Sequence, residues 1–255
     1  MNLPDFSHFA AILALGAGLG FFGGLFGIGG GIIAIPLLAL GFGLPQPLAQ
    51  GTALAMMAPN LLIGWWRYSR RHPVALGKAL AIGLSATLTT AAMAHYATRL
   101  EPQVLRLAFA AFLALLALHM LARRSPAARP VAADLDIRAL PVVGVVGGSS
   151  MGLLGIGGGL VATPLLTGWL AQRQTVAQSL SLALVAPSSM IALGTYAAAH
   201  QVEWSLGLPL AAGGLATVSA GVAVAHRLPE RRLRAAFAWM MLGTAIWLTA
   251  GPALP

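Results

Sequence analysis

A glycine-rich tract occurs twice in this chain and constrains its fold more than any other feature. Residues 24–38 read GLFGIGGGIIAIPLL, and residues 152–166 read GLLGIGGGLVATPLL. The two copies lie 128 positions apart in a chain of 255 residues, and the same offset relates Ala49-Gln50 to Ala177-Gln178 without a gap. The chain is therefore one structural unit used twice, with a glycine-rich break near the start of each copy.

The composition places this duplicated unit in lipid. Hydrophobic residues make up 58% of the chain and charged residues 8%, whereas about 25% is charged in soluble domains. Eight apolar runs are about long enough to span a bilayer, and two more are about half that length. The eight runs are 9–26, 51–66, 74–97, 104–121, 140–154, 176–199, 206–225 and 235–248, and the two short ones are 32–42 and 160–170. The sequence predicts an all-α polytopic membrane protein with roughly 4–5 membrane helices per half, 8–10 in total, and short broken helices at the GIGGG motifs. The number of full crossings stays open.

The basic residues indicate how the halves face. If each half crosses an odd number of times and the N-terminus lies outside, 13 of the 15 basic residues fall on the cytoplasmic side, as the positive-inside rule requires. The sequence therefore predicts an inverted-topology duplication in the bacterial inner membrane. Its parts are a first membrane repeat at 1–122, a cytoplasmic linker at 123–138 and a second membrane repeat at 139–255.

Several function classes are disfavoured. The chain has no cysteine, so disulfides and thiol chemistry are excluded. The formal charge of +9 comes from arginines at segment ends, which indicates topology rather than a nucleic-acid partner. All six carboxylates fall in termini, linker or turns, so no acidic proton relay, metal site or catalytic pair is expected inside the spans. We expect no cofactor and no enzyme activity.

The glycine breaks are the candidate binding sites. Backbone that leaves helical geometry at membrane depth survives only where protein or a water-lined cavity satisfies it. The freed amides at the start of the next short helix attract anions, and nearby amide and hydroxyl side chains can donate to an oxyanion. Close helix packing is the other interpretation of such glycines. The candidate substrate-binding residues are Gly27, Gly29, Gly30, Gly31, Pro36, Gln50 and Asn60 in the first half and Gly155, Gly157, Gly158, Gly159, Pro164, Gln178 and Ser188 in the second.

The doubled GxxGIGGGxxxxPLL tract and the Ala-Gln segment after it resemble the TauE/SafE family of membrane permeases. This resemblance covers essentially the whole chain, and it implies export of sulfite, sulfonate or related organosulfur anions. The residues themselves indicate a small anion without an acidic relay. We expect a carrier working by alternating access down the electrochemical gradient, with the lipid bilayer and a small anion as partners. An anion channel or a carrier of a different small organic anion is the alternative, and the sequence leaves a homodimer open.

Overall fold

Every regular element in the described part of the chain is a helix. The computed structural model describes residues 3–26, 29–71, 73–122, 136–156, 158–172, 174–225 and 230–250, and this part contains no strand. The first half contains α1 (Leu3–Phe26), α2 (Gly31–Pro36), the π-helical η1 (Leu37–Gly41), α3 (Gln46–Arg71), α4 (Leu76–Ala97) and α5 (Pro102–Ala122). The second half contains α6 (Leu140–Leu154), α7 (Gly159–Pro164), the π-helical η2 (Leu165–Trp169), α8 (Gln174–Ala198), α9 (Trp204–Ala225) and α10 (Glu230–Ala250).

Each apolar run of the sequence forms one helical element. The eight long runs correspond to the eight long helices, and the two short runs form α2 with η1 and α7 with η2. Among the described residues, five helices are long and apolar enough to cross a membrane; the five segments are Ser7–Leu25, Leu76–Ala97, Pro102–Ala122, Val176–Ala198 and Trp204–Val224. The prediction of an all-α polytopic membrane protein is confirmed.

Each short helix changes its hydrogen-bond pattern at a proline. Pro36 ends α2 and Pro164 ends α7, and a π-helical segment follows each of them directly. Proline has no N–H and its ring crowds the preceding turn, so the bonding pattern widens there instead of continuing as an α-helix. The matched prolines therefore give both repeats the same short composite helix.

The described helices form two compact units, and neither unit coincides with one sequence repeat. Unit 1 consists of residues 1–60, 100–125 and 200–255, and unit 2 of residues 61–99 and 126–199. Unit 1 thus combines α1, α2, η1, the first part of α3 and α5 with α9 and α10. Unit 2 combines the rest of α3 and α4 with α6, α7, η2 and α8. Each unit takes helices from both halves of the chain.

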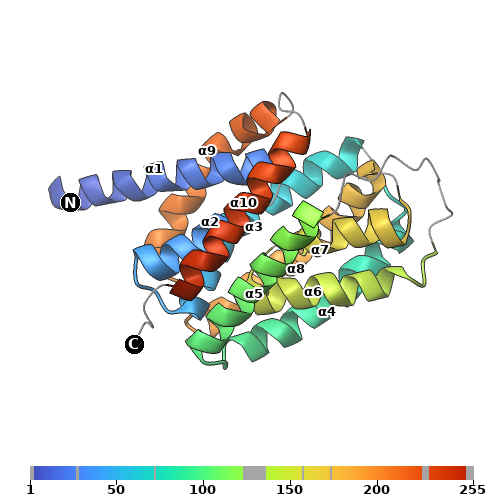
Figure 1. The fold of residues 1–255 in the computed structure, drawn as a ribbon, viewed down its shortest axis with the longest axis horizontal. Helices are drawn as coiled ribbons and strands as arrows, with labels where there is room; N and C mark the ends of the chain where they lie inside the picture. Colours follow the sequence, from blue (N-terminus) through green and yellow to red (C-terminus); the bar gives the residue numbers. More distant parts are fainter. Residues whose placement is uncertain are drawn as a thin grey trace. The chain divides into compact units, whose positions relative to one another are not determined.

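In unit 1, α1 packs along α9 through glycines (Figure 1). A Cβ atom added at three glycines of α1 would come closer than 3.0 Å to the α9 backbone, so only glycine allows this approach. The pairs are Gly16 with Leu210, Gly20 with Gly214 and Gly24 with Val218. Because the residue numbers of the paired positions increase in the same direction along α1 and α9, the two helices run parallel.

In unit 2, α6 packs along α4 in the same way (Figure 1). The pairs are Gly144 with Ile82, Gly148 with Ala86 and Gly152 with Thr90. Each pair is the unit 1 pair shifted by 128 positions, with the roles of the two repeats exchanged. The Thr90 hydroxyl also donates to the Gly148 carbonyl at 3.0 Å. The duplication is thus present in the packing as well as in the sequence.

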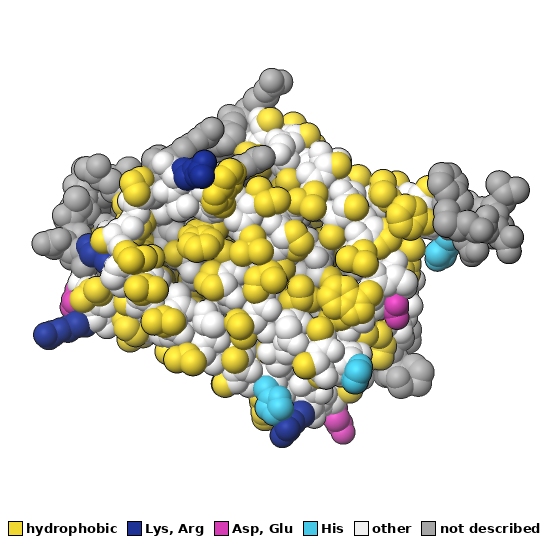
Figure 2. All heavy atoms as spheres, turned by 180° about the vertical axis from the view of Figure 1, so that it is seen from behind, with side chains coloured by type: hydrophobic (Ala, Val, Ile, Leu, Met, Phe, Trp, Pro, Cys, Tyr) yellow, Lys and Arg dark blue, Asp and Glu magenta, His cyan; other side chains and the backbone are white. Residues whose placement is uncertain are grey.

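The surface has the character expected of a protein in lipid. Figure 2 shows hydrophobic side chains spread over the face in view, with few charged and histidine side chains, which lie near its margins. Large apolar side chains such as Leu88 and Leu115 are 72% and 69% exposed. Such exposure is costly in water but not among lipid chains.

Candidate functional site

The glycine break of unit 1 folds back against the helix that precedes it. Gly29 and Gly30 both have a positive φ, 71° and 87°, a left-handed conformation that favours glycine. Gly30 is the N-cap of α2, and its carbonyl accepts from the amides of Ile33 and Ala34. A Cβ at Gly30 would lie 2.9 Å from the Leu19 carbonyl oxygen. The glycines therefore permit both the turn and the close return to α1.

The start of α2 also faces the middle of α3. A Cβ at Gly30 would lie 3.2 Å from Met56 Cε, and one at Gly29 would lie 3.5 Å from Met57 Cε. Both methionine side chains are fully buried. The break of unit 1 is therefore enclosed by α1 on one side and α3 on another.

The break of unit 2 uses a different backbone path. α6 ends at Gly155, whose φ of 65° makes it a left-handed C-cap, and its amide donates to the Met151 carbonyl at 3.0 Å. Gly158, the equivalent of Gly30, is right-handed with φ −53°. A Cβ at Gly158 would nevertheless come closer than 3.0 Å to the Gly147 carbonyl. Gly147 is the equivalent of Leu19, so the same positions meet in both units.

The candidate residues differ in how deeply they lie. Gly30, Gly31, Pro36 and Gln50 are buried in unit 1, and Asn60 is half-buried. In unit 2, Gly155, Gly158 and Ser188 are buried and Gly159 is half-buried, but Pro164 and Gln178 are exposed. Gly27 and Gly157 lie outside the described residues. In unit 1 the structure brings Gly29, Gly30 and the middle of α3 together.

The polar side chains near the breaks differ in their hydrogen-bond partners. Asn60 Nδ2 lies 3.4 Å from the Met56 carbonyl, within its own helix. Thr52 donates to the Leu48 carbonyl at 2.7 Å and accepts from the Glu203 amide at 3.0 Å. Ser188 is fully buried, and its hydroxyl has no hydrogen-bond partner among the described residues. A buried polar atom without a partner costs about 1–3 kcal/mol, so Ser188 is a stronger candidate than Thr52.

Two features of unit 1 were missed from the sequence. Gln46 begins α3, is 2% exposed, and neither atom of its amide has a hydrogen-bond partner among the described residues. Its equivalent by the 128-residue offset is Gln174, so the repeated Gln-x-x-x-Gln spacing was the available signal. Arg106 is 6% exposed and is the one buried charged side chain in the described part of the chain. Its position in the apolar run 104–121 does not tell whether the side chain is buried within the protein.

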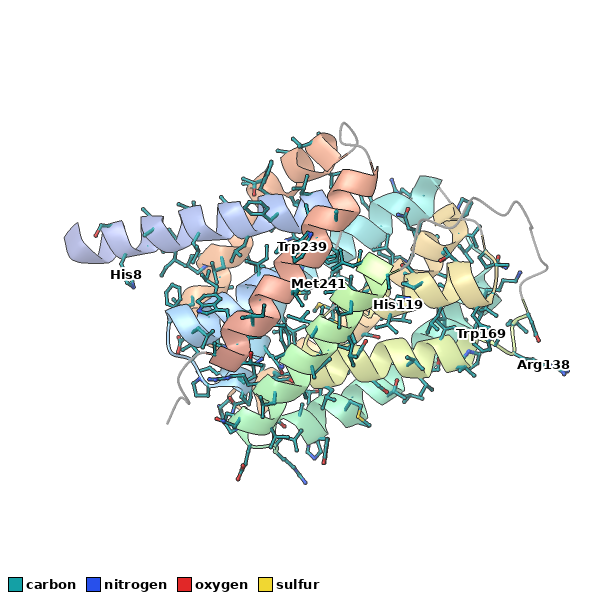
Figure 3. The ribbon with its side chains drawn as sticks, viewed as in Figure 1. His8, His119, Arg138, Trp169, Trp239 and Met241 are labelled. Atoms are coloured by element: carbon teal, nitrogen blue, oxygen red, sulfur yellow. The ribbon has the colours of Figure 1, made fainter. Side chains whose placement is uncertain are left out.

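The histidines whose side chains the structure describes are exposed. Figure 3 locates His8 on α1 and His119 near the end of α5, and both side chains are exposed, as is His95. Among the residues that the structure describes, no three histidine or acidic side chains are grouped as a metal site requires. The break residues themselves offer a ligand backbone amides, and the candidate side chains Gln50, Asn60 and Ser188 are neutral.

Comparison with known proteins gives the family. The family model described as "Sulfite exporter TauE/SafE" matches residues 12–248. The chain belongs to the TauE/SafE family. It is a multi-pass membrane transporter, not an enzyme.

Similar curated proteins have names that agree with this family. A "Probable membrane transporter protein" of Xylella fastidiosa (strain Temecula1) is 28% identical over 247 residues, covering 93% of this chain and 94% of its own. One of Methanocaldococcus jannaschii is 27% identical over 161 residues, covering 61% of this chain and 60% of its own. No solved structure gives a significant match.

Proposed function

We propose that this transporter exports a small anion, sulfite, a sulfonate or a related organosulfur oxyanion, by alternating access. The observation that carries the proposal is the pair of glycine breaks, each leading into a short helix within its own unit. The name of the family supports the sulfur oxyanion. The candidate binding residues are the glycines, prolines and polar side chains predicted from the sequence, with Gln50 foremost because it is fully buried in unit 1.

The chemistry of the breaks fits an anion better than a cation. A helix start presents amide N–H groups and the positive end of the helix dipole. Carboxamides and hydroxyls add donors that need no ionised group. The five carboxylates among the described residues, Asp5, Glu101, Asp136, Glu203 and Glu230, lie at helix starts or between helices. A cation at the breaks would therefore lack a counter-charge.

The distribution of basic residues supports an inverted repeat. If each half crosses an odd number of times and the N-terminus lies outside, 13 of the 15 basic residues fall on the cytoplasmic side, as the positive-inside rule requires. We propose the N-terminus outside and the linker in the cytoplasm.

Export needs no coupling ion on energetic grounds. Expelling one negative charge from a cell that is negative inside gains about 2.3 kcal/mol per 100 mV. A carrier that releases a monoanion along this gradient needs no embedded proton or sodium site. The placement of the carboxylates outside the helix interiors is consistent with such a uniporter.

The test is transport by purified protein in liposomes with an imposed membrane potential. The panel consists of sulfite, sulfate, thiosulfate, taurine, sulfoacetate, acetate and chloride. We expect saturable flux and counterflow of a sulfur oxyanion toward the positive side. Gln50→Leu should lower that flux, whereas Thr90→Val, which removes an equally buried donor to the Gly148 carbonyl, should lower stability only.

Each of the other possible outcomes would indicate a different kind of transporter. Flux that never saturates and shows no counterflow would indicate a channel. Preference for acetate would indicate a carrier of small organic anions, and accumulation of substrate against the potential would require a coupling site. Leucine at Gly30 or Gly158 is unsuitable for this test, because a side chain there meets backbone at Leu19 or Gly147 and would disturb packing first.

A further inference from the structure

Gln46 is a buried carboxamide without a partner in the described structure. It is the first residue of the 26-residue helix α3 and is 2% exposed. Neither Nε2 nor Oε1 has a hydrogen-bond partner among the described residues. Buried polar groups are nearly always paired, so a buried amide with both atoms unpaired calls for an explanation outside packing. A hydrogen-bonding ligand supplies one.

Gln46 shares one face of α3 with the residues that contact the glycine break. Gln50, Met57 and Asn60 follow it at helical spacing, which places all four on one side of the helix. Met57 is the residue whose Cε lies 3.5 Å from the Cβ position of Gly29. This side of α3, the α3 track, therefore leads from the start of the helix to the break, over about 16 Å at 1.5 Å per residue.

The second repeat carries an equivalent face on α8. Gln174, Gln178, Val185 and Ser188 occupy the same positions 128 residues later. Val185 Cγ2 lies 3.5 Å from the Cβ position of Gly159, so this face also reaches its own break. Ser188, at the far end of the face, is fully buried, and its hydroxyl has no partner in the described part of the structure. An unpaired buried polar atom thus occurs on the same helix face in each unit.

We propose that the α3 track is the path along which the anion reaches the break of unit 1, with Gln46 as a binding residue at its start. This inference rests on the proposed function. Carboxamide N–H groups bind the oxygens of an oxyanion without neutralising its charge. Binding is then weak enough for the anion to move on from Gln46 to the break. Neutral donors also favour a monoanion over a dianion, because a second unneutralised charge would add to the cost of desolvation.

The test compares Gln46→Leu with wild-type protein in liposomes, with radiolabelled sulfite as the probe. Leucine removes the unpaired amide, so we expect a melting temperature in detergent equal to or above that of wild type. The initial rate should fall at least tenfold. Gln46→Glu should lower the rate further, since a carboxylate on the track repels the anion.

Thr52→Val is the matched control. Thr52 is fully buried on the same helix but off the track, and it is paired with Leu48 and Glu203. Its replacement should lower the melting temperature and leave the KM for sulfite unchanged. This opposite pattern separates a binding role of Gln46 from general sensitivity of α3.

Two results would overturn the inference in distinguishable ways. If wild-type protein moves sulfite and Gln46→Leu moves it equally fast, the track is wrong and the proposed function stands. If wild-type protein moves no anion of the panel, the proposed function fails and the track fails with it.

Discussion

The glycine breaks of units 1 and 2 have the same sequence pattern but different backbones and different burial. In unit 1 Gly30 is left-handed, with φ 87°, and Gln50 is fully buried. In unit 2 the equivalent glycine, Gly158, is right-handed, with φ −53°, and the equivalent glutamine, Gln178, is exposed. The IGGG sequence therefore permits more than one path, and each unit uses one of them.

The long helices behave in the opposite way, because their contacts repeat at equivalent positions. Gly20 meets Gly214 in unit 1, and Gly148 meets Ala86 in unit 2, 128 positions away on both sides. Backbone-to-backbone packing tolerates no added atom, so both copies keep it. The comparison indicates that each unit has a rigid helix pair with conserved packing, whereas the backbone conformation of the break differs between the units.

The largest expected effect tests the rigid pair. Gly20→Val and Gly148→Val each place a branched side chain where a single Cβ already comes closer than 3.0 Å to backbone. We expect each to cost about 3 kcal/mol of the free energy of unfolding, measured by denaturant titration in detergent. Gly18→Val is the control, since a Cβ there meets nothing within 4 Å. A loss in only one unit would show that the packing is not equivalent.

The next effect concerns how unit 2 completes its break. Tyr196 is fully buried, and its hydroxyl donates to the Gly152 carbonyl at 3.2 Å, near the end of α6. Tyr196→Phe leaves that carbonyl without the bond, at a cost of about 1–3 kcal/mol. Tyr96→Phe, at a side chain that is 56% exposed, should leave the melting temperature unchanged. Equal melting temperatures for the two variants would remove Tyr196 from the support of the break.

The sequence predicted the existence of the helices well because lipid requires long apolar runs. Runs 32–42 and 160–170 became the short composite helices. The sequence could not show that α1 packs along α9 rather than along a helix of its own repeat. Apolar periodicity indicates which face of a helix is buried but not which helix packs against it. It also could not tell Gln50 from Gln178, since identical residues at matched positions differ only in tertiary surroundings.

A smaller effect, of opposite sign in the two units, tests the backbone of the breaks. Gly29→Ala forces alanine to φ 71°, with no atom closer than 3.5 Å, and should lose about 1–2 kcal/mol through strain alone. Gly159 is the first residue of α7, and a Cβ there is also no closer than 3.5 Å to any atom. Gly159→Ala should therefore be neutral or more stable by up to about 1 kcal/mol.

The measurement is denaturant titration of both alanine variants under identical conditions. Gly43→Ala is the control for strain without packing, because Gly43 has φ 66° and open space around its Cβ position. It should lose about as much as Gly29→Ala. If Gly29→Ala were as stable as wild type, the left-handed turn of unit 1 would not be fixed by glycine.

The smallest effect concerns a polar contact present in unit 2 alone. Thr163 of α7 and Ser181 of α8 share a hydrogen bond of 2.9 Å between their hydroxyl oxygens. The equivalent residues of unit 1 are Ile35 and Ala53, both fully buried and apolar. Thr163→Val or Ser181→Ala alone should cost about 1 kcal/mol, because each leaves the other hydroxyl without this partner.

The double variant decides whether the contact matters to the fold. With both hydroxyls removed, unit 2 acquires the apolar character of unit 1, and the free energy of unfolding should return to within about 0.5 kcal/mol of wild type. A double variant that loses the sum of the two single effects would mean that the hydroxyls act independently. In that case the stability of the short helix of unit 2 would depend on polar contacts that are absent from unit 1. The two breaks would then differ in their stabilising interactions as well as in their backbone conformation.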